Sequence, residues 1–380
     1  MGVEGRRRLR RGALALVLFL VSAAAAEAIW IAWRTRPLYQ RVAAGGRGWR
    51  GRVHAAHPEL GFAPIPAARG AHTFPIGPDV PMRYDERGFR VPADQAGAGP
   101  PRRPLVLAVG GSFTYADACR AEDAFVYRVA QGLGGGAVNA GVPAWGLVSM
   151  LLRAREVIPR LEPDLVLAQY STWLVERAVS PIAPTYAGLV PVPHFVTTPV
   201  GGLEIRPPAF ATIAFDLPLS DYARRPTSLS GLLSFFFRVG VPLYLHDDYH
   251  LLRHRLRTAL RGAAPPARDG NAVIGRVYGE LAELSRAAGA RLVVVVLDRG
   301  PWPAHVPKEL SALDAIVVDA HRALLERVDV EDPVAYSRAY QHWRGDPPVQ
   351  VDPHPNPAAH AIIAEAILRQ IGGPNTQHEE

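Results

Sequence analysis

The chain has 380 residues, and 48% of them are hydrophobic, which is enough apolar material for a large core in one or two domains. The formal net charge is +7, but five arginines within the first eleven residues supply much of it, directly ahead of an apolar run. Arginines directly ahead of an apolar run are typical of the cytoplasmic side of a membrane-spanning helix, and they argue against a nucleic-acid-binding face. The single cysteine, Cys119, excludes an intrachain disulfide, so the fold must rest on its core.

The apolar run covers residues 13–33 and is interrupted only by a serine and a glutamate. A helix of about 21 residues spans a bilayer. The arginines of residues 1–12 predict a short cytoplasmic tail, so the rest of the chain would lie outside the cytoplasm as a single-pass protein of the inner membrane. A cleaved signal peptide is the alternative, because Ala24, Ala25 and Ala26 offer a peptidase site. We favour an uncleaved anchor because the apolar run continues past that site to Trp33.

Residues 34–104 show little periodicity and contain glycine-rich loops, so we expect an extended linker and lead-in that lies across the main domain. From residue 105 the pattern alternates between apolar strands and amphipathic helices. The predicted strands are residues 105–109, 137–139, 164–170, 291–297 and 315–318, and the predicted helices are residues 122–133, 147–158, 274–288 and 357–371. This alternation predicts an α/β domain over residues 105–372, with a parallel sheet and helices on both faces.

Two segments fall outside this alternation. Residues 181–270 are rich in proline and aromatic side chains, and we interpret them as an insertion that forms a lid or a membrane-facing surface. Residues 373–380 are expected to be a tail.

Ser112 stands directly after the first predicted strand, in the turn Gly110-Gly111-Ser112. Ligands of open α/β sheets bind at this carboxyl edge, and two glycines allow the backbone to approach closely. A serine there could act as a nucleophile if a base removes its proton. The alternative is an ordinary turn in which Ser112 only caps a helix.

His354 follows Asp352 by two residues in a loop ahead of the last predicted helix. A carboxylate can fix the imidazole tautomer while the other ring nitrogen faces a serine, which would make His354 a base and Asp352 its partner. In the alternative, Asp352 and Asn356 are turn and capping residues, and His354 is solvated.

The chain resembles the SGNH (GDSL-type) hydrolase superfamily in four sequence blocks that occur in order. They are VLAVGGSFTYAD (residues 106–117), NAGVPAWG (139–146), EPDLVLAQYS (162–171) and DPHPNPAAHAIIAEAIL (352–368). The segments HPELGF (57–62) and DERGFRVP (85–92) are similar to the lead-in of membrane-anchored bacterial members. The resemblance covers roughly residues 57–180 and 271–372. It implies an SGNH, flavodoxin-like sheet.

The resemblance also implies roles for individual residues. Ser112 would be the nucleophile and the first oxyanion donor, His354 the base and Asp352 its partner. Gly141 would supply the second oxyanion N–H. The third block lacks the family's asparagine, so a hydroxyl of Ser171 or Thr172 would have to replace it as a donor.

Two further departures from the family pattern are visible. Gly111 stands where the family usually has an aspartate, and the Asp–His spacing is one residue shorter than usual. Loss of one oxyanion donor typically lowers the rate by about 10² to 10³. Weak activity, an altered substrate and an inactive relative are therefore all compatible with the sequence.

A histidine-rich stretch between residues 246 and 254 has spacings that could ligate a metal from one helix face. Arginines interleave with these histidines, so a polar, solvated face is expected instead, and we expect no metal and no cofactor.

Together these features predict a serine esterase that acts on acyl esters of the cell envelope, such as an O-acylated polysaccharide or a lipid. An O-acyltransferase acting on an exopolysaccharide and a non-catalytic binding protein with the same fold are the alternatives. No nucleic-acid partner is expected.

Overall fold

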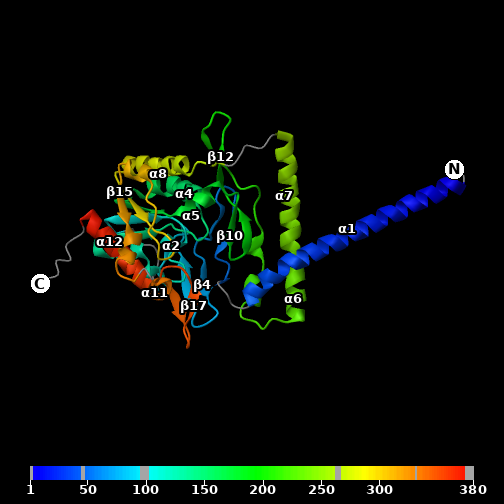
Figure 1. Cartoon of the computed structure of the whole chain (residues 1–380), viewed down its shortest axis with the longest axis horizontal. Coiled ribbons are helices and arrows are strands. Elements are labelled where there is room, and N and C mark those ends of the chain that lie inside the picture. Colours follow the sequence, from blue (N-terminus) through cyan, green and yellow to red (C-terminus); the bar gives the residue numbers. More distant parts are fainter. Residues whose placement is uncertain (1–2, 44–47, 95–101, 262–266, 330–331, 373–380) are drawn as a thin grey trace.

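The computed structural model describes residues 3–43, 48–94, 102–261, 267–329 and 332–372. A single long helix, α1 (Val3–Ala43), projects from an α/β body (Figure 1). The body contains a nine-stranded sheet in the order β1-β4-β5-β6-β8-β7-β9-β14-β15. The predicted α/β class, preceded by one apolar helix, is confirmed.

One half of the sheet is parallel. Its strands are β8 (Gly136–Asn139), β7 (Leu105–Val109), β9 (Leu165–Tyr170), β14 (Arg291–Val296) and β15 (Ile316–Asp319). Every residue of β7 and β9 is buried. Strands that are covered on both faces read as continuous apolar runs, which is why the sequence pattern located them.

Helices cover both faces of this parallel half. On one face α3 (Phe125–Gly132) and α10 (Ala320–Leu325) pack on α12 (Pro357–Ile371), and on the other α4 (Leu147–Leu161) packs on α8 (Gly270–Ala287). The shorter elements of the body are η1 (Ala121–Asp123), α5 (Thr172–Val179), α9 (Lys308–Ser311) and α11 (Pro333–Tyr340).

Two helix ends illustrate how local sequence sets the boundaries. Asn356 caps α12, because its side-chain oxygen accepts the N–H of Ala359 at 3.0 Å, as predicted. The predicted stop of α4 before Pro159 is wrong. The helix runs on to Leu161, and Glu162 ends it in a left-handed conformation with φ 44°.

The lead-in, expected to be an extended linker, instead builds the other half of the sheet. Residues 34–43 continue α1, and the antiparallel strands are β1 (Gly48–Arg50), β4 (Arg69–Thr73), β5 (Val80–Tyr84) and β6 (Arg90–Val91). Arg90 pairs with Asn139 of β8 and joins the two halves. A separate hairpin is formed by β2 (His54–His57) and β3 (Gly61–Pro64).

The insertion after residue 180 is folded. It begins with two hairpins, β10 (Ile182–Thr185) with β11 (Gly188–Pro191) and β12 (His194–Thr197) with β13 (Leu203–Arg206), followed by η2 (Ala214–Asp216) and η3 (Leu219–Tyr222). A continuous helical rod follows: α6 (Leu229–Phe235), the π-helical turn η4 (Phe236–Gly240) and α7 (Val241–Arg261). Figure 1 shows this rod crossing the body-proximal end of α1.

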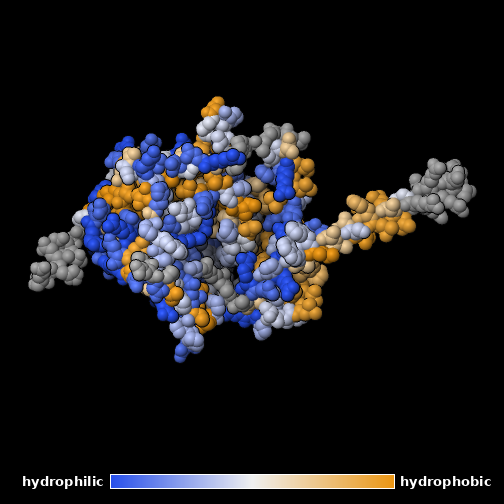
Figure 2. Space-filling model, in the orientation of Figure 1, coloured by the Kyte–Doolittle hydropathy of each residue, from blue (hydrophilic) through white to orange (hydrophobic). Residues whose placement is uncertain are grey.

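Helix α1 changes character along its length. Side chains from Leu14 to Val21 are exposed and apolar, and Figure 2 shows the orange stretch they form outside the body. Near the body, Ile31, Leu38 and Tyr39 are buried. The segment Gly12–Ala43 is long and apolar enough to span a membrane, which agrees with the predicted apolar helix at residues 13–33.

Candidate active site

Ser112 is the first residue of the short helix α2 (Ser112–Tyr115), immediately after β7. His354 lies between β17 (Val349–Asp352), which pairs with β16 (His342–Arg344), and α12. Ser112 and His354 line one cavity of about 620 Å³. The fold therefore brings together two segments that lie far apart in the sequence.

The turn that carries Ser112 is held by Gln169 of β9. Its side-chain oxygen accepts the N–H of Gly111 at 3.0 Å, the N–H of Thr114 at 3.2 Å and the Thr114 hydroxyl at 2.9 Å. A β-carbon at Gly110 would collide with Thr114 and Gln169, so this position requires glycine. We did not predict the role of Gln169, although a polar residue inside the apolar run LVLAQY was a signal for it.

Asp352 orients His354. The Oδ1 atom of Asp352 lies 2.6 Å from Nδ1 of His354 and also accepts the backbone N–H of His354 at 2.8 Å. The carboxylate is fully buried at the end of β17. A proton on Nδ1 leaves Nε2 of His354 as the basic nitrogen of the ring.

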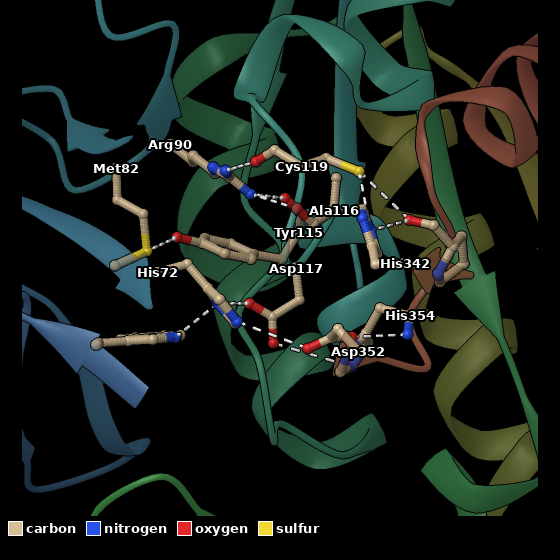
Figure 3. A network of polar contacts seen from close by, with 12 residues as sticks. His72, Met82, Arg90, Tyr115, Ala116, Asp117, Cys119, His342, Asp352 and His354 are labelled. Carbon is tan, nitrogen blue, oxygen red and sulfur yellow. Dashed lines mark hydrogen bonds and ion pairs between the residues drawn. The ribbon is translucent and has the colours of Figure 1, made fainter. Parts of the chain in front are cut away.

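Two residues without a predicted role, His72 of β4 and Asp117, complete a closed cluster with Asp352 and His354 (Figure 3). Nδ1 of His72 lies 3.0 Å from Oδ1 of Asp117, and Oδ2 of Asp117 lies 3.9 Å from Nε2 of His354. On the other side, Nε2 of His72 lies 3.6 Å from Oδ2 of Asp352. Two imidazoles thus alternate with two carboxylates.

The electrostatics of this cluster favour a charged pair. Burial opposes protonation of His72, but the carboxylates of Asp117 and Asp352 outweigh it and raise the pKa of His72 to about 9. Although burial acts in the opposite direction, His72 holds the pKa of Asp117 below its usual value. The indole N–H of Trp49 also points at Nδ1 of His72 as a donor, at 3.1 Å. A protonated Nδ1 cannot accept that bond and donates to Asp117 instead.

Two of the expected oxyanion donors have other partners. The N–H of Gly141 donates to Oδ1 of Asn139 at 3.0 Å. The hydroxyl of Thr172 donates to the carboxylate of Asp298, with its closer oxygen at 3.0 Å. The N–H of Ser112 remains a candidate, because the first N–H groups of a helix have no intrahelical partner.

Trp173 follows Thr172 and packs close to the site. Its ring and that of His354 both lie against Phe113, with centroid distances of 4.9 and 5.7 Å. The indole N–H of Trp173 is buried and has no hydrogen-bond partner among the described residues. Ser171, the other expected hydroxyl, accepts the side-chain N–H of Gln169 at 2.9 Å.

The cavity walls combine apolar and cationic side chains. The insertion contributes a wall through Tyr186 and Leu219, and the last turn of α1 contributes Arg41. Arg177 and Arg299 also line the cavity. Burial and the positive charge of Arg299 lower the pKa of Arg177 to about 10, so an anion in this cavity would relieve an unfavourable interaction.

The histidine-rich stretch lies on α7. Nδ1 of His246 lies 3.2 Å from Asp247, and Asp248 forms an ion pair with Arg34 of α1 at 2.7 Å. Within the ranges that the structure describes, no group of three or more His, Cys, Asp or Glu side chains is arranged to hold a metal ion.

No family model matches this sequence, and no curated protein matches it. Solved structures that are similar include TesA, at 14% identity and a TM-score of 0.32, covering 70% of this chain and 97% of its own. A lipolytic protein of the G-D-S-L family from Desulfitobacterium hafniense DCB-2 has 10% identity and a TM-score of 0.34, covering 70% and 99%. A mutant of Axe2, an acetylxylan esterase from Geobacillus stearothermophilus, has 14% identity and a TM-score of 0.35, covering 73% and 98%.

Proposed function

We propose that the chain is a membrane-anchored serine esterase of the SGNH type, with its body outside the cytoplasm, acting on acyl esters of cell-envelope polysaccharide or lipid. The observation that carries the proposal is the placement of Ser112 and His354 in one cavity, with Asp352 2.6 Å from Nδ1 of His354. A base held by a buried carboxylate is what a serine hydroxyl needs to become a nucleophile.

In the proposed reaction Oγ of Ser112 attacks the ester carbonyl carbon, and Nε2 of His354 accepts the hydroxyl proton. The tetrahedral intermediate collapses to an acyl-serine, and the leaving alcohol takes the proton from His354. Water then attacks the acyl-serine and gives its proton to His354. The acid is released, and the proton returns to Ser112. Asp352, supported by Asp117 3.9 Å from Nε2, stabilises the imidazolium that forms in each half-reaction.

The cavity charge suggests a substrate class. Arg177 and Arg299 would bind an anionic group, such as a carboxylate or phosphate, next to the ester. The cavity also includes Arg41 and Val42, which lie in the last turn of α1, beyond its exposed apolar side chains. An ester carried by an anionic glycan or lipid near the membrane surface satisfies both features.

Each of the two alternative functions is favoured by one observation. Transfer of the acyl group to a sugar hydroxyl would use the same acyl-serine, and the wall provided by the insertion, including Tyr186, would limit access of water. A non-catalytic binding role is favoured by the other partners of Gly141 and Thr172.

The test is hydrolysis of p-nitrophenyl acyl esters by the full-length protein in detergent. The assay is run with and without a sugar whose free hydroxyl groups can accept the acyl group. We expect hydrolysis that Ser112→Ala abolishes and that Ser220→Ala, a change of another serine in the same cavity, leaves intact. Acyl transfer to the sugar at the expense of hydrolysis would favour the acyltransferase. Hydrolysis equal in wild type and Ser112→Ala would contradict both enzymatic readings.

A further inference from the structure

The rod formed by α6, η4 and α7 is fixed against the base of the anchor helix. Arg34 of α1 donates to Asp248 at 2.7 Å, and its guanidinium lies 4.0 Å from the centroid of the Tyr244 ring. At the crossing, Thr35 lies so close to Gly240 that a β-carbon there would collide with the Thr35 side chain. The depth of the rod relative to α1 is therefore set by direct contacts.

The rod has one face that packs on the protein. Phe235, Val239, Leu243 and Asp247 are buried on it. Their spacing of four residues places them on a single side of a helix. Phe235 and Val239 share a core with Leu38 and Tyr39 of α1.

The rod also has an apolar face that is exposed. Seven large apolar side chains are between 48% and 73% exposed: Leu229, Leu233, Phe237, Leu245, Tyr249, Leu252 and Leu256. Within α6 and within α7 they recur every three or four residues, as one helix face requires. The π-helical turn adds about one residue to a turn, so the eight residues from Phe237 to Leu245 correspond to about two turns. Counted in helical turns in the same way, the apolar stripe lies on the opposite side of the rod from the buried face.

The apolar stripe of the rod lies on the side of the body from which the apolar part of α1 projects. Figure 2 shows orange side chains on the edge of the rod that lies on the same side of the body as the orange stretch of α1. Trp30 and Trp33 of α1 stack at 5.2 Å just before Arg34. Tryptophans of membrane helices concentrate at the headgroup level. Because Arg34 contacts the rod directly, the rod lies near that same level.

The rod is long enough to span a bilayer, but its geometry argues against a span. The rod crosses α1 instead of running alongside it (Figure 1). If α1 spans the bilayer, the rod therefore cannot span it as well. One face is apolar, and α7 also carries exposed Arg253, Arg255 and Arg257. An amphipathic helix with arginines beside its apolar face lies in the plane of the membrane interface and favours anionic lipids.

We propose that the rod is a second membrane attachment, lying in the surface of the bilayer that α1 spans, with its apolar stripe at the boundary between headgroups and acyl chains. Two crossed attachments fix the tilt of the body, which a single helix cannot do. The cavity wall includes Leu219, which packs in the same buried cluster as Phe235 and Val239 of the rod, so the cavity is then held at a constant height above the lipid.

The experiment uses single-cysteine variants of the full-length protein in liposomes that contain anionic lipid. Cys119 is buried, and burial raises the pKa of its thiol, so the wild type serves as the labelling blank. An environment-sensitive fluorophore is attached at Leu245→Cys or Leu252→Cys on the stripe, at Leu18→Cys in the span, and at His254→Cys. His254 is exposed on α7 but lies on the opposite side of the helix from the stripe.

We expect the labels at Leu245→Cys and Leu252→Cys to emit at shorter wavelength than the label at His254→Cys, and to be quenched by a nitroxide near the headgroup end of lipid chains. The label at Leu18→Cys should be quenched best by a nitroxide deep in the chains. Equal, water-like emission at the stripe and at His254→Cys would overturn the proposal. Shielding of the stripe in native membranes without lipid quenching in liposomes would also overturn it and identify a protein partner. None of these outcomes depends on enzymatic activity.

Discussion

Nδ1 of His354 lies 2.6 Å from Oδ1 of Asp352, although a single residue separates the two in the chain. The spacing is one residue shorter than in the family that the sequence resembles, but the same carboxylate oxygen also accepts the backbone N–H of His354 at 2.8 Å. In this turn the aspartate side chain accepts a hydrogen bond from the backbone N–H two residues later. The turn places the imidazole of His354 next to the carboxylate of Asp352. The shorter spacing is therefore compatible with a serine–histidine–aspartate arrangement.

The first prediction concerns this contact. Asp352→Asn keeps the size of the side chain but lets it present an N–H to Nδ1, so His354 would favour the tautomer with its proton on Nε2 and could not accept the proton of Ser112. We expect ester hydrolysis to fall by about 10³- to 10⁴-fold. The matched control is Asp314→Asn, at a strongly exposed carboxylate, which should leave the rate unchanged. A rate for Asp352→Asn within a factor of about three of wild type, less than 1 kcal/mol, would contradict the assigned role.

The second prediction is a pH dependence of stability. The pKa of His72 is about 9 in the folded chain against an ordinary value of 6.5, so the folded state binds more protons than the unfolded state between these values. This stabilisation is fully present below about pH 6.5 and is lost as the pH rises through 9. Its size is on the order of 3 kcal/mol, because His72 is buried between two carboxylates.

We therefore expect the apparent Tm of the detergent-solubilised protein, read from intrinsic fluorescence, to fall between pH 6.5 and 9. In His72→Gln the fall should be much smaller, and the Tm at pH 6.5 should be lower than in wild type. Parallel pH profiles for the two proteins would show that His72 is not the titrating group.

The third prediction concerns the support of the nucleophile turn. Gln169→Met leaves the N–H groups of Gly111 and Thr114 and the Thr114 hydroxyl without their buried acceptor. Each unpaired donor costs about 1–3 kcal/mol, so we expect a lower Tm and a much less reactive Ser112. Ser171→Ala is the control, because it removes only the partner of the Gln169 N–H and leaves the acceptor in place. Equal effects of the two changes on reactivity would contradict a specific role for the Gln169 oxygen.

The fourth prediction concerns a replacement oxyanion donor. The buried indole N–H of Trp173 has no hydrogen-bond partner among the described residues, and a catalytic role is one explanation for such a group. Trp173→Phe removes this donor while keeping an aromatic ring against Phe113. We expect the acylation rate to fall by about 10²-fold with little change in KM, because the oxyanion loses a hydrogen-bond donor. An unchanged rate in a folded variant would leave the N–H of Ser112 as the donor that the structure supports.

The sequence was most informative where local pattern and structure coincide. Strands β7, β9 and β14 were visible because burial on both faces makes them continuous apolar runs, and α12 because Asn356 and Pro357 mark its start. Strands β4 and β5 were missed because they are short and include glycine, proline and polar residues.

The missed site residues have a different cause. His72 and Asp117 contact Asp352 and His354 only because of the tertiary fold. No spacing of residues in the sequence predicts such a contact. The segment that forms the rod was interpreted as part of a proline-rich insertion that forms a lid or a membrane-facing surface, and the continuous helical rod itself was not predicted. It continues through Pro242 because that residue lies in the first turn of α7, where the π-helical turn already changes the backbone hydrogen bonds.

Activation of Ser112 by His354 can be measured by covalent labelling. The full-length protein in detergent is treated with a fluorophosphonate and read by intact mass, beside Ser112→Ala, His354→Ala and the cavity control Ser220→Ala. We expect one adduct in wild type and in Ser220→Ala, and none in the other two variants. No adduct on a protein shown to be folded by circular dichroism, or an adduct that persists in Ser112→Ala, would contradict activation of Ser112 by His354.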